Sequence, residues 1–412
     1  MIKTINKFIL FLILVFIYEL SIVIFKLDGV SISKIVVTSF LWLSVGLVIH
    51  TFVKNYRKFR DSIPRFSFYI FWLLIIWNSI NIFRGLYSES GSLTTVLGNT
   101  YNTLALLLPF VIVFSIKIVN IKIIKPYFFI LLRIGIILFI LFFIFGQGVL
   151  NDTQIKILNL FFLPVVFLIT IIYFERKKFI ILLAVVLLFY VAYVNSSRTM
   201  IIRELLLIIG LIQLYFYRKF HFRWILKGTF ILLFVPLIFI QNSMNTGESV
   251  IKKTIGSVSD NELSNDTRTF LYLEVYQDLA ENNQLLFGKG SDGTYYSEYF
   301  NEAKGSSSFR HTAEVGVLAI LLKSGLIGVL LYLLLLFSAI YYALFRSHNY
   351  YVVGIGLMLF IYTQILFIEN LISYSSHNIY VWFFIGICLS KQMRNMSNLE
   401  FKIFLNHKNK LH

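Results

Sequence analysis

Long apolar runs separated by short polar gaps dominate this chain. A helix needs about 20 predominantly apolar residues to cross the hydrocarbon layer of a bilayer, which is about 30 Å thick. Runs of this kind predict about twelve transmembrane helices. The predicted spans are residues 8–25, 35–53, 66–83, 94–116, 126–146, 157–173, 179–194, 199–217, 224–240, 326–345, 351–368 and 377–390. We therefore expect an all-α polytopic membrane protein.

The polar gaps between these runs alternate in character along the chain. Every second gap is rich in Lys and Arg, while the others are short and poor in them, apart from the long segment that begins at Gln241. Basic gaps of membrane proteins face the cytoplasm, so both termini are expected there and the long segment outside. The predicted parts are transmembrane helices 1–9 (residues 1–240), an extracytoplasmic loop with short helices, active-site elements and an interfacial helix (241–325), and transmembrane helices 10–12 with a cytoplasmic tail (326–412).

Composition and charge agree with this topology. Of the 412 residues, 58% are hydrophobic and 14% are charged, whereas about 45–50% is the usual apolar share of a soluble domain. The net charge of +17 is spread over the cytoplasmic gaps and is not gathered on one soluble face, which argues against nucleic-acid binding. The single cysteine, Cys388, lies in the last apolar run, so it offers neither a disulfide framework nor a Cys-based metal site. No Asp-x-Asp motif or His/Cys cluster suggests a metal, and no cofactor is expected.

An amphipathic stretch from Ser264 to Ala280 predicts a helix in the extracytoplasmic loop. Its apolar residues recur at helical spacing, at Phe270, Leu273, Tyr276 and Ala280. Asp266 is suited to cap its start. Arg268 would then lie in the first turn, where free N–H groups and the helix dipole favour an anion. Arg268 is therefore a candidate phosphate ligand, and a solvated surface arginine is the alternative.

A second candidate is His311, just before an apolar stretch that is too long for one upright span and is interrupted at Lys323-Ser324-Gly325. We expect a short interfacial helix beginning near His311, a break near Gly325, and then a transmembrane helix. His311 would lie at the outer membrane surface, where an imidazole can take a proton from a hydroxyl. The alternative is a histidine that merely begins a helix.

A third element lies at the outer end of the span 199–217. Arg198 is at its rim, and Arg203 and Glu204 lie one to two turns inside it. Ionisable groups at membrane depth are costly and mark a functional site or an internal pair, although Arg198 at the rim could also bind ordinary lipid phosphates. Further candidates to line a substrate site are Lys289, Arg310, Tyr295, Glu369 and His377.

The segment Leu286–Gly290, Leu-Phe-Gly-Lys-Gly, carries glycines that permit positive φ and a close approach of the backbone to a ligand. It lacks the G-x-x-x-x-G-K-[ST] pattern, so it does not predict an ATP site. Arg84 is a further polar residue expected to be buried.

The order of these elements resembles the bacterial O-antigen and capsular polysaccharide repeat-unit polymerases together with the O-antigen ligases. The shared features are Ser197-Arg198 at the start of a middle span, an external loop with an Arg-led helix and Leu286–Gly290, and a His-led helix followed by Gly325–Gly328. The resemblance covers about Asn195 to Phe345, and the earlier spans match only in number and hydrophobicity.

This resemblance implies a glycosyltransferase C-type (GT-C) fold in the bacterial cytoplasmic membrane. It further implies metal-independent, inverting transfer of an undecaprenyl-pyrophosphate-linked glycan on the outer face, with membrane lipids, a flippase and a chain-length regulator as partners. By motif match, Arg198 and Arg268 bind the pyrophosphate, with Arg203 as a further candidate, and His311 activates the acceptor hydroxyl. Ligases typically have Asn after this histidine, and Thr312 at that position favours a polymerase.

Two alternatives remain open. One is an O-antigen ligase, which transfers the glycan to another acceptor. The other belongs to a different class, a flippase or transporter of lipid-linked oligosaccharides, which can also have about twelve spans. A transporter should show internal repeats and broken helices at mid-membrane, and we find neither in the sequence.

Overall fold

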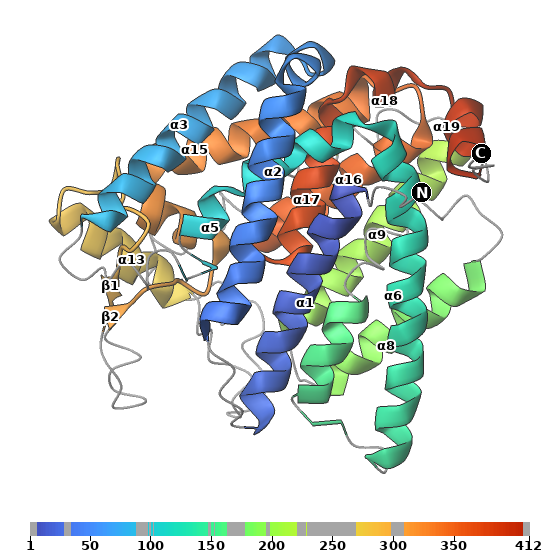
Figure 1. Cartoon of the computed structure of the whole chain (residues 1–412), viewed down its shortest axis with the longest axis horizontal. Helices are drawn as coiled ribbons and strands as arrows, with labels where there is room; N and C mark the ends of the chain where they lie inside the picture. The colour runs from blue at the N-terminus through green and yellow to red at the C-terminus, as the bar shows by residue number, and fades with distance from the viewer. Residues whose placement is uncertain are drawn as a thin grey trace.

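The computed structural model describes residues 6–28, 34–87, 98, 100–101, 103–146, 150–151, 153–162, 178–194, 198–220, 228, 269–297 and 309–406. These residues fold almost wholly into α-helices, as the apolar runs predict (Figure 1). Among the described helices, three are long and apolar enough to cross a membrane: Arg65–Leu86, Val119–Phe145 and Gly316–Phe345. Shorter apolar helices pack with them, so the chain is an all-α integral membrane protein.

The first part of the chain consists mainly of long helices. They are α1 (Lys7–Asp28), α2 (Lys34–Ser62), α3 (Arg65–Leu86), α6 (Ile118–Phe145), α8 (Lys178–Val194) and α9 (Arg198–Phe220). Between α3 and α6 lie the short α5 (Thr103–Leu106) and the 3-10 helix η1 (Leu108–Ile116). The prediction of one regular helix over 94–116 was therefore wrong in its described part. Pro109 lies in the first turn of η1, where its missing N–H and its ring favour the start of a new helix over continuation of the old one.

The second part contains a small loop unit and the central helices. The loop unit comprises α13 (Thr269–Glu281) and an antiparallel pair of short strands, β1 (Tyr295–Tyr296) and β2 (Phe309–Arg310). The helices that follow are α15 (Gly316–Phe345), α16 (Tyr350–Leu366), α17 (Ser376–Leu389), α18 (Lys391–Asn395) and α19 (Asn398–Asn406).

The core of the bundle is formed by α16 and α17. Nearly all their side chains are buried, because α17 packs on η1, α15 and α1, and α16 packs on α15 and α9. By contrast, α6 exposes a stripe of large apolar side chains, which include Ile130, Ile134, Ile137, Ile140 and Ile144. An exposed apolar stripe of this size is expected for a helix that faces lipid. The start of α6 at Ile118 precedes the predicted start at residue 126, and Pro126 lies inside the helix.

Helices α3 and α15 lie side by side and antiparallel at one edge of the molecule (Figure 1). Near the start of α3, Ser67 Oγ lies 2.6 Å from Ser338 Oγ in the second half of α15. Further along, Trp77 Nε1 donates to the Ser324 carbonyl at 2.8 Å. The 22 residues of α3 span about 33 Å at 1.5 Å per residue, which is close to the thickness of the hydrocarbon layer.

Basic residues gather where α2 ends and α6 begins. Partial burial lowers the pKa of Lys117, and the positive charges of Lys58, Lys54 and Lys7 lower it further. Asn6, before α1, donates to Asn120 Oδ1 at 3.2 Å. Since α3 starts directly after α2, one end of α3 lies at this basic cluster and the other end lies at the loop unit.

Helix α15 confirms the predicted break but not the predicted start. Gly325 is non-helical, with φ 65° and ψ −172°. The helix begins at Gly316, five positions after His311, because the preceding backbone is bonded elsewhere. Asn370 donates from its side chain to the Ala313 carbonyl at 2.7 Å and from its backbone to the Glu314 carbonyl at 2.7 Å. These bonds hold residues 313–315 against the turn after α16.

The helix predicted after Arg268 is present as α13, but its apolar face was assigned wrongly. The buried positions are Leu271, Val275 and Leu279, and Tyr276 is exposed. The buried side chains join Tyr295 and the first turns of α15 in a core of their own. Both stripes have helical spacing, so the choice between them depends on which neighbours the helix packs against.

Parts of the predicted topology lie outside the described residues. These are the span 224–240 apart from residue 228, the later part of span 157–173, and the segments 241–268 and 298–308 of the extracytoplasmic loop. The number of spans and the GT-C fold remain predictions.

Candidate active site

The segment Leu285–Asp292, which we call the docked loop, packs directly on the break in α15. Lys289 N donates to the Leu322 carbonyl at 2.7 Å, and Gly290 N donates to the Lys323 carbonyl at 3.0 Å. In return, Leu326 N donates to the Leu285 carbonyl at 3.0 Å. The backbone groups that the break removes from the helix ladder thus find their partners in the docked loop, as buried polar groups require.

Two glycines make this close backbone contact possible. Gly288 and Gly325 both have positive φ, of 68° and 65°. A Cβ atom on Gly288 would lie 2.5 Å from Gly325 N, and one on Gly325 would lie 2.6 Å from Gly288 N. We expected the glycines of this motif to admit a ligand, and here they admit the backbone of α15 instead.

Arg84, at the end of α3, binds the docked loop from its other side. Its Nη1 donates to the Phe287 carbonyl at 2.7 Å and its Nη2 to the Gly288 carbonyl at 2.6 Å. Ser291 N donates to the Asn81 carbonyl at 2.9 Å. The docked loop is therefore held between the end of α3 and the break in α15.

The docked loop ends at Asp292, whose carboxylate contacts His311. Asp292 Oδ1 lies 3.6 Å from His311 Nδ1. The aspartate side chain is 1% exposed and the histidine side chain is 50% exposed. The pairing of Tyr295 with Arg310 and of Tyr296 with Phe309 brings the two segments together. His311 thus has one ring nitrogen facing a buried carboxylate and an accessible edge that can meet a substrate.

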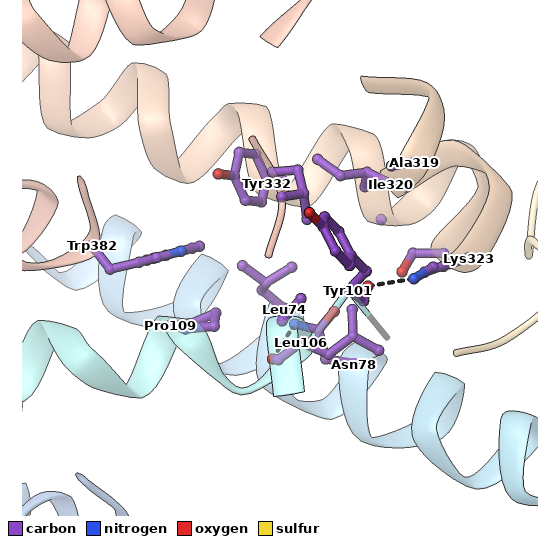
Figure 2. A pocket seen from close by; sticks show the side chains of 14 residues that line it. Leu74, Asn78, Tyr101, Leu106, Pro109, Ala319, Ile320, Lys323, Tyr332 and Trp382 are labelled. Atoms are coloured by element: carbon purple, nitrogen blue, oxygen red, sulfur yellow. Dashed lines mark hydrogen bonds between the residues drawn. The ribbon is translucent and has the colours of Figure 1, made fainter. Parts of the chain in front are cut away.

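Lys323 is a buried basic residue two positions before Gly325. Its side chain is buried, and its Nζ donates to the Tyr101 carbonyl. The ammonium also interacts electrostatically with Asp292. Lys323 and Tyr101 lie beside a small cavity of about 30 Å³. Leu74, Tyr332 and Trp382 also line this cavity (Figure 2). A largely apolar cavity with a basic residue in its wall thus lies behind the docked loop.

Three more predicted site residues lie in the loop unit. Lys289 Nζ pairs with Asp278 Oδ2 of α13 at 2.6 Å, and Arg310 Nη2 pairs with Glu314 Oε1 at 3.3 Å. Tyr295 is fully buried in the loop unit's core, and burial raises the pKa of Tyr295 to about 12, while Arg310 opposes this rise. Its ring therefore packs inward and is not available to stack on a sugar.

Glu369 and His377 lie around the turn that joins α16 to α17. The Glu369 carbonyl accepts from Gly316 N at 3.2 Å, so this turn touches the start of α15. His377 is buried in the first turn of α17, with its ring 5.8 Å from that of Tyr362. Among the described residues, Asp292 is the charged side chain within ion-pair distance of His311, and neither Glu369 nor His377 joins that pair.

The predicted pyrophosphate ligands have no described side chains. Arg198 begins α9, as predicted for this helix, and Arg203 and Glu204 lie in its first two turns. Arg268 immediately precedes α13 and lies outside the described residues. Their distances to His311 remain predictions.

Sequence reasoning missed Asp292 and Lys323 as site residues. Lys323 carried a usable signal, because an ionisable residue inside an apolar stretch is costly and usually functional. Asp292 carried little, since it is one of many acidic residues in the extracytoplasmic loop. Only the packing of the docked loop shows that its carboxylate is buried beside His311.

Residues 183–333 match the model of a protein family described as O-antigen ligase. No curated protein matches the chain. The matched segment runs from α8 into the second half of α15 and contains the docked loop, Asp292, His311 and the break.

Proposed function

We propose that this membrane protein, which through residues 183–333 belongs to the O-antigen ligase and polymerase superfamily, polymerises lipid-linked oligosaccharide repeat units. The substrate is an undecaprenyl-pyrophosphate-linked repeat unit, and the product is an O-antigen or capsular polysaccharide. The observation that carries the proposal is the half-exposed His311 beside the buried Asp292, inside the matched segment.

The chemistry follows from the leaving group. Nε2 of His311 takes the proton of the acceptor hydroxyl while the hydroxyl oxygen attacks the anomeric carbon. The bond from that carbon to the pyrophosphate oxygen breaks, and the lipid pyrophosphate leaves with the electron pair. Arg198 and Arg268, with Arg203 nearby, neutralise the charge that develops on it. A single displacement inverts the anomeric configuration, and it needs no metal because the leaving group is already a good one.

The proposed location is the outer face of the bacterial cytoplasmic membrane, with both termini in the cytoplasm. The basic cluster of Lys7, Lys54, Lys58 and Lys117 supports this orientation, because basic ends of spans face the cytoplasm. The docked loop lies at the opposite end of α3, about 33 Å away along the helix axis. A substrate whose lipid tail stays in the bilayer would present its pyrophosphate at that height.

The ligase alternative rests on the same residues and differs only in the acceptor. The matched family is described as O-antigen ligase, which favours it, whereas Thr312 after His311 favours a polymerase. The transporter alternative gains one observation, since α15 is broken at Gly325. That break is closed by backbone bonds to the docked loop, however, and does not open to a substrate.

Polymer synthesis in liposomes tests the proposal. Purified protein receives its lipid-pyrophosphate-linked repeat unit, and products are resolved by length for wild type, His311→Ala and His348→Ala. We expect a ladder from the wild type, a rate at least about 100-fold lower for His311→Ala because general base catalysis contributes that much, and an unchanged ladder for His348→Ala. His348 is an exposed histidine near Arg394 at the other end of α15.

Each other outcome assigns a different function. Transfer of one glycan to a separate acceptor without a ladder would identify a ligase. Movement of the lipid-linked glycan across the membrane without transfer would identify a transporter. A full ladder from His311→Ala would exclude His311 as the base.

A further inference from the structure

We propose that Asp292 is the positioning residue of His311. Its buried carboxylate holds Nδ1 of the imidazole inward, so that Nε2 faces the acceptor hydroxyl. The catalytic part of this inference rests on the proposed function. The assignment of Asp292 itself rests on the geometry of the pair.

At 3.6 Å the pair is an electrostatic contact and not a hydrogen bond, and it favours one tautomer of the histidine. A neutral imidazole has one N–H and one bare nitrogen. With Asp292 Oδ1 3.6 Å from Nδ1, the favourable arrangement places the proton on Nδ1, facing the carboxylate. Nε2 then carries the lone pair that a general base needs. The exposure of half the imidazole agrees with an outward-facing Nε2.

The backbone around Asp292 leaves the carboxylate little freedom. The preceding Ser291 is fully buried, and its N–H is bonded to the Asn81 carbonyl. Gly85 of α3 packs so closely that a Cβ atom on it would meet Ser291 Oγ and lie 2.9 Å from Asp292 N. Gly293 N donates to the Gly290 carbonyl at 3.1 Å and closes a turn around Asp292. Such support from a second layer of contacts is what keeps a catalytic group in a productive position.

Lys323 is the basic residue that interacts with Asp292 from the buried side. A carboxylate that is 1% exposed is unfavourable unless a cation or hydrogen bonds compensate it. Lys323, also buried, interacts with Asp292 and is held by the Tyr101 carbonyl. The order Lys323, Asp292, His311 therefore runs from the buried break of α15 to the accessible imidazole.

In the described part of the loop around His311, two ion pairs join other charged side chains to one another. They are Arg310 with Glu314 on the histidine's own segment, and Lys289 with Asp278 between the docked loop and α13. Glu274 of α13 acts on Tyr295 from the same side. Asp292 is thus the described carboxylate placed to respond to the charge of His311.

Asp292 becomes important when the proton of the acceptor hydroxyl is transferred to His311. As the O–H bond of the acceptor breaks and the Nε2–H bond forms, the imidazole becomes a cation. The Asp292 carboxylate stabilises that cation, and the proton later leaves Nε2 for water. Replacing Asp292 with a neutral residue should therefore slow the chemical step and leave substrate binding nearly unchanged.

The test compares wild type, Asp292→Asn, Asp292→Glu and the control Asp61→Asn, an exposed carboxylate of α2. For each we would measure kcat and KM for chain extension as a function of pH. We expect kcat to fall at least about 100-fold in Asp292→Asn with KM changed less than about threefold, partial recovery in Asp292→Glu, and no change in Asp61→Asn.

A second readout does not require turnover. Nitrogen NMR of protein labelled with 15N in its imidazole rings reports which ring nitrogen of His311 carries the proton, and the spectrum of His311→Ala assigns the signals. We expect the proton on Nδ1 in the wild type and shared between the two nitrogens in Asp292→Asn. The same tautomer in wild type and Asp292→Asn, in protein that elutes as a folded species, would overturn the inference. Absence of polymer from the wild type would overturn the proposed function, and the tautomer would still decide whether Asp292 controls His311.

Discussion

The centre of the bundle and the end that carries His311 are both tightly packed, but by different means. In α16 and α17, apolar side chains such as Leu359 and Phe383 are fully buried and fill the space between helices. At the docked loop, the contact is largely backbone against backbone, with positive-φ glycines on both sides. Around it, Lys323, which is buried, and Arg84, which is only partly buried and not fully buried as predicted, donate to carbonyl oxygens.

The difference indicates which region of this protein is more sensitive to substitution. Side-chain packing tolerates substitutions that conserve volume. A close backbone-to-backbone contact has no room for an added side-chain atom. A carbonyl oxygen that is already hydrogen-bonded to a side chain can accept few other donors. The end that carries His311 should therefore be far more sensitive to small changes than the centre. Four substitutions test this contrast.

The largest effect is expected from Gly325→Ala. Alanine at φ 65° and ψ −172° is strained by about 1–3 kcal/mol, and its Cβ would also displace the docked loop. The transfer rate should fall at least about tenfold, because 1.4 kcal/mol corresponds to a factor of ten. Chain-extension assays and helix content by circular dichroism would check this, with Gly46→Ala, which meets no atom within 4 Å, as the control. Full activity in Gly325→Ala would contradict the backbone-contact model.

A somewhat smaller effect is expected from Arg84→Ala. It removes hydrogen bonds from a partly exposed guanidinium to the Phe287 and Gly288 carbonyls. Because water can reach and replace part of this bonding, the total loss should be only about 1.5 kcal/mol, the lower end of the net range for hydrogen bonds to charged groups. The docked loop should become sensitive to limited proteolysis, and transfer should slow. Arg60→Ala is the matched control, because Arg60 forms an exposed pair with Asp61, worth at most about 1 kcal/mol. Equal protease resistance in both variants would show that Arg84 does not hold the loop.

Leu359→Met in α16 should have a small effect although its side chain is fully buried. The exchange conserves volume, so we expect a loss of less than about 1.5 kcal/mol and near-normal transfer. A thermal unfolding scan in detergent, with Leu359→Ala as the cavity-forming comparison at a cost of about 2–5 kcal/mol, measures it. If Leu359→Met abolished activity, the contrast between the two regions would be wrong.

The smallest effect concerns the C-terminal helix α19, which packs on the first turn of α16 and away from the docked loop. Ser397 N donates to Glu400 Oε2 at 2.7 Å, and Glu400 N donates to Ser397 Oγ at 3.2 Å, which is a capping box. These bonds lower the pKa of Glu400. Because the pKa is lower in the folded state, the stabilisation is present above the unfolded value and is lost as the pH falls through the folded one. The protection of α19 amides from hydrogen exchange, relative to their intrinsic rates at each pH, should therefore fall in acid, and Glu400→Gln should remove that pH dependence without changing transfer.

The sequence alone predicted the all-α membrane character and the break at Gly325, which the structure confirms, and it named His311 as a candidate. These features are local, because an apolar run, a glycine or an isolated histidine can be recognised from a short stretch of sequence. Local sequence patterns predicted helix boundaries and buried faces less well where contacts with neighbouring elements determine them. The start of α15 moved to Gly316 because Asn370 bonds the preceding backbone, and the buried face of α13 turned toward Leu271, Val275 and Leu279.

Only the tertiary structure decided what surrounds His311. Arg84, Asp292 and Lys323 come from α3, the docked loop and α15, which lie far apart in sequence and meet only when the loop seats on the break. Nothing in the periodicity of any one segment encodes such a meeting. A buried carboxylate becomes tolerable only after a basic residue and a tight backbone have been brought around it, and that is a property of the assembled fold.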